Sequence, residues 1–141
     1  MGRIQRFEDI EAWKTARQLT KAVYKATREP PFSKDRDLAS QIQRAAVSVM
    51  SNIAEGFDSN SKPEFAQFLN YARRSTGEVQ FHLYVALDQA YISESCFATL
   101  YEQAQTARRM VVSFMGYLRT DHALKSSKSS WSSKSSESSK T

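Results

Sequence analysis

The spacing of apolar residues between Leu38 and Phe57 constrains the fold of this chain more than any other feature. Apolar residues recur there at steps of three and four, on one face of a helix: Leu38, Ile42, Ala45, Val49, Ile53 and Phe57. Small residues occupy other faces, so more than one neighbour can approach closely. We expect a central packed helix that ends at Gly56, with Asn52 and Glu55 forming a small polar contact that fixes helix register or the next turn.

Three further segments show the same periodicity, which predicts four helices at about 7–28, 34–57, 61–91 and 93–120. Glycine and proline are scarce, with four and three in 141 residues, which argues against a turn-rich β fold. The predicted class is therefore all-α, an antiparallel up-down four-helix bundle. We assign residues 1–124 to the bundle and 125–141 to a disordered Ser/Lys-rich C-terminal tail.

Local signals set the predicted helix ends. The prolines at 30–31 stop the first helix, because proline cannot continue one. Ser33 is the expected N-cap of the second helix, and Ser61 with Glu64 forms a capping box at the start of the third. Gly77 lies inside the third helix, where glycine costs about 1 kcal/mol relative to alanine. We therefore expect Gly77 to make a close contact with another backbone.

The net charge of +5 is unevenly distributed. Residues 125–141 contain four lysines and one glutamate (+3), and the remaining residues contain 16 basic and 14 acidic side chains (+2). Solubility accounts for most of this excess, which is only a general indication of nucleic-acid binding. The tail either binds phosphates loosely, is phosphorylated or is a passive extension, and we favour the passive extension.

Side chains suited to metal binding or catalysis lack the neighbours that such chemistry requires. Cys96 is alone, and His82 and His122 are far apart in the sequence. Glu55 and Glu78 lack the Glu-x-x-His motifs of di-metal bundles, and there is no glycine-rich phosphate loop. We expect no cofactor, no metal, no small-molecule substrate and no enzymatic activity. One cysteine and the lack of an apolar run of about 18 residues favour a cytoplasmic protein without a membrane span.

Basic residues are expected to form a belt around the middle of the bundle. Counting from the predicted turns places them at about the same height, within roughly one helical turn. These candidate nucleic-acid-binding residues are Arg17, Lys21, Arg44, Arg73, Arg74, Arg108 and Arg109. In a ring of identical subunits the belt would repeat and attract a phosphate backbone. The alternative is a solvated face whose arginines pair with Glu78, Asp88 and Glu102.

The third helix carries a second apolar stripe outside its core stripe. We assign Tyr71, Phe81, Tyr84 and Val85 to an oligomer interface, because surplus apolar faces often mark subunit contacts. A surface for stacking nucleic-acid bases is the alternative.

Four motifs carry a resemblance to a known family: F-x-D-I-x-A-W at 7–13, L-x-x-Q-I-x-R-A-A-x-S at 38–48, S-N-I-A-E-G at 51–56 and F-x-x-F-L-x-x-A-x-x-S at 65–75. The chain resembles the bacterial four-helix bundles named after 23S ribosomal RNA intervening-sequence proteins. It is more distantly similar to accessory variability determinant proteins of diversity-generating retroelements. Met50 departs from the pattern, since many members have proline there.

The resemblance implies a ring-shaped homo-oligomer, a pentamer in the retroelement branch. It also implies an association with RNA, which is genetic in the main family and physical in the retroelement branch, whose members assist a reverse transcriptase. Our first interpretation is a non-enzymatic homo-oligomeric adaptor that binds structured RNA or an RNA–protein complex through its basic surface. A protein–protein scaffold without nucleic-acid binding is the second. A small-molecule or metal-dependent bundle enzyme is the third.

Overall fold

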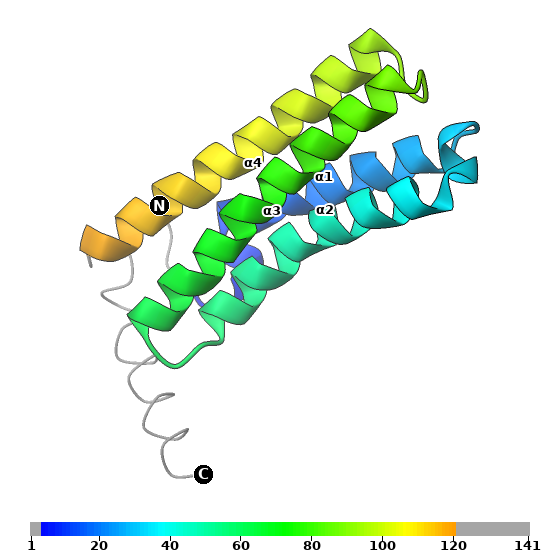
Figure 1. Cartoon of the computed structure of the whole chain (residues 1–141). Coiled ribbons are helices and arrows are strands. Elements are labelled where there is room, and N and C mark those ends of the chain that lie inside the picture. Colours follow the sequence, from blue (N-terminus) through cyan, green and yellow to red (C-terminus); the bar gives the residue numbers. More distant parts are fainter. Residues whose placement is uncertain (1–3, 121–141) are drawn as a thin grey trace.

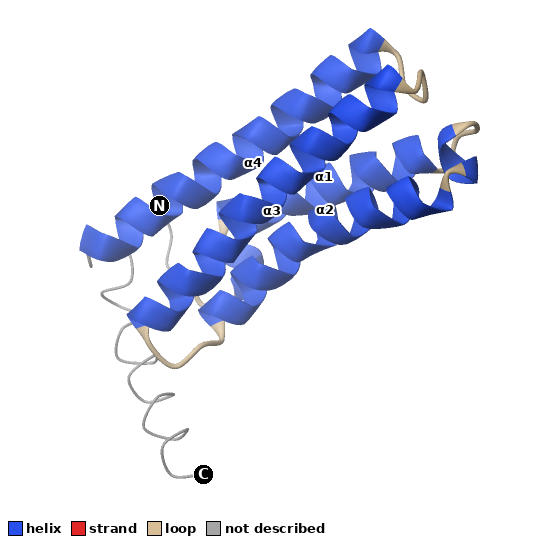
Figure 2. Cartoon of the chain, viewed as in Figure 1, coloured by secondary structure: helices blue, strands red, loops and turns tan. Residues whose placement is uncertain are grey.

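The structure is a computed structural model in which residues 4–120 are described. Its helices are α1 (Glu11–Thr27), α2 (Arg36–Phe57), α3 (Lys62–Asp88) and α4 (Glu94–Thr120), with short 3-10 turns η1 (Phe7–Asp9) and η2 (Phe32–Lys34) before α1 and α2. Consecutive helices run antiparallel (Figure 1), and the described residues contain no strand (Figure 2). The predicted all-α up-down bundle is confirmed, and the predicted tail lies outside the described residues.

The helices form a closed four-membered arrangement in which α1 and α3 are diagonal. The contacts between α2 and α3 are the most extensive, and those between α1 and α4 are the least extensive of the four adjacent pairs. Because α1 and α3 are diagonal partners, their outer faces point away from each other.

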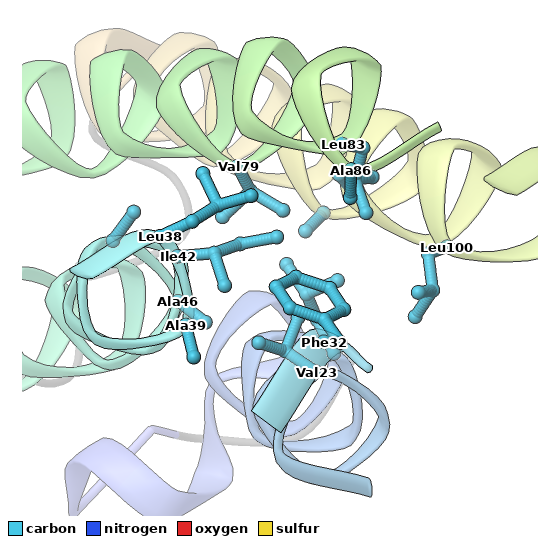
Figure 3. Close-up of a cluster of buried hydrophobic side chains, with 14 residues drawn as sticks. Val23, Phe32, Leu38, Ala39, Ile42, Ala46, Val79, Leu83, Ala86 and Leu100 are labelled. Atoms are coloured by element: carbon cyan, nitrogen blue, oxygen red, sulfur yellow. The ribbon is translucent and has the colours of Figure 1, made fainter. Parts of the chain in front are cut away.

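The core has two clusters, one at each end of the bundle. Figure 3 shows the cluster at the α1–α2 turn, where Phe32 lies among side chains from the helices, including Val23, Ile42 and Leu83. The other cluster includes Phe65 of α3. Full burial of side chains of this size contributes about 1.5–3 kcal/mol each. The core stripe predicted for α2 is buried except at Phe57, which is half-buried.

Three predicted helix boundaries differ from the structure. Residues 7–9 form a 3-10 turn with Ile10 extended, so α1 begins at Glu11. Ser33 lies inside η2, and Asp35 is the N-cap of α2, where its Oδ1 accepts a 3.1 Å hydrogen bond from Leu38 N. α3 ends at Asp88, three residues before its predicted end. The prediction that Ser61 caps α3 is confirmed, because its Oγ accepts a 3.2 Å hydrogen bond from Glu64 N, which is one half of the predicted capping box.

Gly56 and Gly77, the helical glycines of α2 and α3, have different surroundings. Gly56 does not end α2, which continues through Phe57 with no positive φ at any described glycine. Instead it is buried, and a Cβ there would lie 2.7 Å from Phe65 Cδ1 and 3.0 Å from Phe68 Cβ. A Cβ at Gly77 would meet only Arg108 Nη1 at 4.0 Å. The predicted close backbone contact at Gly77 is therefore wrong.

A small polar contact joins α2 and α3, as expected for Asn52. Asn52 Nδ2 donates hydrogen bonds to the Ser48 carbonyl at 2.8 Å and to Ser48 Oγ at 2.9 Å. Ser75 Oγ of α3 also donates to Ser48 Oγ, at 2.9 Å. Glu55 is exposed and takes no part in this contact, so the expectation of a polar contact among apolar residues is wrong for Glu55.

Candidate nucleic-acid interface

Four hydrogen bonds fix the relative heights of the helices around the bundle. They are Thr20 Oγ1 to the Ala46 carbonyl (3.2 Å), Ser75 Oγ to Ser48 Oγ (2.9 Å), Gln80 Nε2 to Gln105 Oε1 (2.9 Å) and Thr15 Oγ1 to Met110 Sδ (3.0 Å). Each bond joins two adjacent helices. The height of any other residue follows by counting from the nearest pair at 1.5 Å per residue.

This counting places the seven predicted cations in the middle of the bundle, but in a band wider than one turn. Arg17 is level with Arg108, and Arg74 and Arg109 differ by about 3 Å in height. Arg44 lies about 8 Å from the level of Arg74, which exceeds the 5.4 Å pitch of one helical turn. The cations therefore form a broad central band. We call the seven residues Arg17, Lys21, Arg44, Arg73, Arg74, Arg108 and Arg109 the central band.

Most of the positive charge in the central band is uncompensated. Five of its side chains are exposed, and Arg73 and Arg108 are half-buried. Arg109 forms an ion pair with Glu102, with 2.8 Å between Nη2 and Oε1. Within residues 4–120 the other six form no ion pair. The predicted alternative of pairing with Glu78, Asp88 and Glu102 therefore holds only for Glu102.

Neutral neighbours orient several of these guanidinium groups without cancelling their charge. Arg73 Nε donates to Asn70 Oδ1 at 3.0 Å. The Arg17 guanidinium carbon lies 6.0 Å from the centre of the Trp13 ring, within reach of a cation–π interaction. Such contacts position a charge while leaving it available to an anion.

The outer face of α1 extends the positive charge beyond the central band. Lys14 is neutralised by Glu11, with 2.8 Å between Nζ and Oε2. Lys25 and Arg28 continue the row that begins at Arg17 and Lys21, and both are exposed. We define Arg17, Lys21, Lys25 and Arg28 as the α1 row. Sequence analysis did not include Lys25 or Arg28 among the binding residues, although their four- and three-residue spacing was visible.

The predicted interface residues of α3 form an exposed apolar surface. The exposed fractions are 41% for Tyr71, 55% for Phe81, 50% for Tyr84 and 42% for Val85. Tyr84 also contacts α4, because its ring centre lies 4.9 Å from that of Phe97. This apolar α3 surface points away from the α1 row, since the two helices are diagonal in the bundle.

Residues 4–120 contain no group of three His, Cys, Asp or Glu side chains positioned to hold a metal ion. His82 is buried, and desolvation lowers the pKa of its imidazole against the opposing charge of Glu78. Burial likewise raises the pKa of the Cys96 thiol, which makes it a poor nucleophile at neutral pH. His122 lies outside the described residues. No helix in the described part of the chain is both long and apolar enough to cross a bilayer.

Fold and surface together define a helical bundle with a central band of cations and an apolar face on the opposite side from its most basic helix. The model of the family described as 23S rRNA-intervening sequence protein matches residues 8–113, and the chain belongs to this family. No curated protein matches the chain.

The fold is shared with a solved structure from Bacteroides thetaiotaomicron, a protein of unknown function from the S23 ribosomal protein family. The two are 18% identical in sequence, with a TM-score of 0.64. The similarity covers 74% of this chain and 97% of the other.

Proposed function

We propose that the protein is a non-enzymatic, cytoplasmic adaptor that self-associates and binds RNA, alone or within an RNA–protein complex such as a reverse transcriptase. The observation that carries the proposal is the central band, in which six of seven cations have no acidic partner within residues 4–120. Membership of a family named for 23S rRNA intervening sequences supports RNA as the polyanion.

The physical basis is the release of counterions from the phosphate backbone. The logarithm of the binding constant falls linearly with the logarithm of the salt concentration. Each phosphate neutralised by Lys or Arg makes this slope more negative by about 0.7 for single strands and about 0.9 for duplexes. Backbone contacts of this kind give affinity with little sequence discrimination. An adaptor that recognises RNA by its charge and shape needs no catalytic group.

The test is RNA binding measured by fluorescence anisotropy at several salt concentrations. The triple variant Arg17→Gln, Arg44→Gln, Arg74→Gln removes three exposed, unpaired charges of the central band. The control variant has the same net charge and changes three exposed cations near the bundle ends to glutamine: Lys34, Arg36 and Arg119. We expect the band variant to lose at least tenfold in affinity and to have a shallower salt slope. Equal losses in both variants, or no salt-sensitive binding by the unmodified protein, would contradict the proposal.

Self-association is assigned to the apolar α3 surface of Tyr71, Phe81, Tyr84 and Val85. Exposed apolar residues gathered on one helix suit a contact between identical subunits. The pentamer is the stoichiometry that the retroelement resemblance implies. Mass measurement by light scattering tests this assignment: Phe81→Glu should yield monomers, whereas the same change at exposed Val112 on α4 should not.

A protein–protein scaffold is the competing function, and the same apolar α3 surface favours it. The two functions differ in their response to RNA. A stable oligomer that binds no RNA at low salt, and that loses one specific protein partner when Phe81 is changed, would support the scaffold. An oligomer that binds RNA in a salt-dependent way supports the adaptor.

A further inference from the structure

Two members of the α1 row, Arg17 and Lys21, have a charge arrangement that does not serve helix stability. Like charges at i and i+4 destabilise a helix, and Arg17, Lys21 and Lys25 are spaced in this way. The only acidic residue of α1, Glu11, is occupied by Lys14. Lys25 and Arg28 lie near the C-terminal end of α1, where a positive charge interacts favourably with the helix dipole. Arg17 and Lys21 lie too far from that end to gain from this interaction. A local rule broken without structural compensation is typical of a functional surface.

The geometry of the α1 row fits a strand of nucleic acid. Its four cations span about 16 Å along the helix at 1.5 Å per residue, and they line one open depression on the bundle surface. Tyr24 lines the same depression and is 41% exposed. A row of cations with an exposed aromatic ring is the combination that holds single strands, by backbone charge and base stacking.

A polar seam adjoins this depression between α1 and α4. The seam is lined by Gln18, Thr99, Gln103 and neighbouring residues, and Gln18 and Gln103 line the α1 depression as well. Gln103 Oε1 is a buried side-chain acceptor without a hydrogen-bond partner among the described residues. An unpaired buried acceptor is unfavourable in the isolated bundle.

The position of α1 also keeps this surface accessible in an oligomer. The apolar surface assigned to self-association lies on α3, the diagonal partner of α1. Subunits that pair through the outer face of α3 would leave the outer face of α1 uncovered. The central-band residues Arg73 and Arg74 lie on α3 itself, so they are closer to that contact.

We propose that single-stranded RNA runs along the outer face of α1, with its phosphates on the α1 row and a base stacked on Tyr24. The assignment rests on the proposed RNA-binding function and makes it more specific: α1, rather than the whole central band, supplies most of the affinity, and the ligand is unpaired RNA. Gln18, which is exposed, lies beside the bound strand, where its amide can exchange hydrogen bonds with base edges.

Two quadruple variants that remove equal charge test the location. One changes the α1 row (R17Q, K21Q, K25Q, R28Q), and the other changes cations on the remaining helices (R44Q, R73Q, R74Q, R108Q). Binding to a labelled single-stranded RNA of mixed sequence is measured on the full-length chain, with helix content checked by circular dichroism. We expect the α1 variant to bind at least tenfold more weakly than the second variant. Equal losses, or a larger loss in the second variant, would overturn the location while leaving RNA binding itself intact.

The substitution Tyr24→Ala tests the single-stranded character of the ligand. Base stacking on an aromatic side chain is specific to unpaired bases, so we expect at least a fivefold loss of affinity for the single strand and less than a twofold change for a duplex of the same sequence. A similar loss for both ligands, or for neither, would overturn the stacking role. Failure of the unmodified protein to bind any RNA would instead refute the proposed function on which this inference rests.

Discussion

Gly56 of α2 packs directly against the ring of Phe65 at the start of α3, so that a Cβ on Gly56 would lie 2.7 Å from Phe65 Cδ1. Helix α3 also presents the backbone-proximal Cβ of Phe68 at 3.0 Å, which cannot move aside by a simple rotation. We predict that Gly56→Ala destabilises the fold by about 1–3 kcal/mol, the usual cost of overpacking a core. Urea unfolding followed by circular dichroism measures the change.

Gly77→Ala is the matched comparison on α3. A Cβ there meets only Arg108 Nη1, at an ordinary contact distance of 4.0 Å. Since alanine is favoured over glycine inside a helix, this variant should be more stable by about 0.5–1 kcal/mol. The same substitution should therefore lower the stability at Gly56 and raise it at Gly77. This comparison separates the effect of core packing from the effect of helix propensity. A loss of stability at Gly77 would show that a closer neighbour is present.

Asp35→Ala should destabilise the protein by about 0.5–2 kcal/mol, because Asp35 rather than Ser33 caps α2. Its Oδ1 accepts from Leu38 N at 3.1 Å, and its Oδ2 accepts from the Tyr91 hydroxyl at 2.9 Å. Chemical denaturation of Asp35→Ala and Ser33→Ala side by side measures both effects. We expect Ser33→Ala to stay within about 0.5 kcal/mol of the unmodified protein. A larger effect at position 33 than at 35 would assign the cap to Ser33.

The hydrogen bond from Ser75 Oγ to Ser48 Oγ should couple α2 to α3 energetically. Ser48 Oγ also accepts from Asn52 Nδ2, so Ser48→Ala removes the acceptor of two donors. We predict a loss of about 0.5–1.5 kcal/mol for each of Ser48→Ala and Ser75→Ala. The double variant should lose less than the sum of the two single losses, by at least about 0.5 kcal/mol. Additive losses in this double-mutant cycle would show that the two hydroxyls act independently.

Features that depend on local spacing were predictable from the sequence. The core stripe of α2 was predicted because apolar spacing alone determines which face is buried. The predicted N-cap of α2 was wrong because the choice between Ser33 and Asp35 depends on the η2 turn. Phe32 in this turn is fully buried, and its ring centre lies 5.5 Å from that of Tyr91 in a distant segment. A contact between residues so far apart in sequence has no local signature.

In the candidate site, too, features that depend on local spacing were predictable, and contacts between side chains were not. Counting along antiparallel helices located the central band, because 1.5 Å per residue converts sequence positions into heights. Pairing was not predictable, since Arg109 reaches Glu102 at 2.8 Å while Glu78 and Asp88 form no ion pair with the band. The prediction for Gly77 was wrong because the cost of glycine inside a helix does not show how closely a neighbouring helix approaches it. The polar seam at Gln103 depends on how α1 and α4 pack together.

Protonation of His82 should make the fold less stable in mild acid. Burial lowers the pKa of His82 below its ordinary value of 6.5, although the charge of Glu78 opposes the shift. A lowered folded-state pKa means that the unfolded chain binds the proton more readily. The stability from His82 is therefore complete above pH 6.5 and is lost as the pH falls towards the folded-state pKa.

Urea midpoints at pH 7.5 and pH 5.5 measure this dependence for the unmodified protein and for His82→Gln. We expect the midpoint of the unmodified protein to fall more on acidification than that of the variant, because glutamine does not titrate. His122 is present in both proteins and cancels in the comparison. The variant Glu78→Gln removes the opposing charge, so NMR titration should show a still lower pKa for His82 in it. Equal acid sensitivity with and without His82 would assign the pH dependence to other groups.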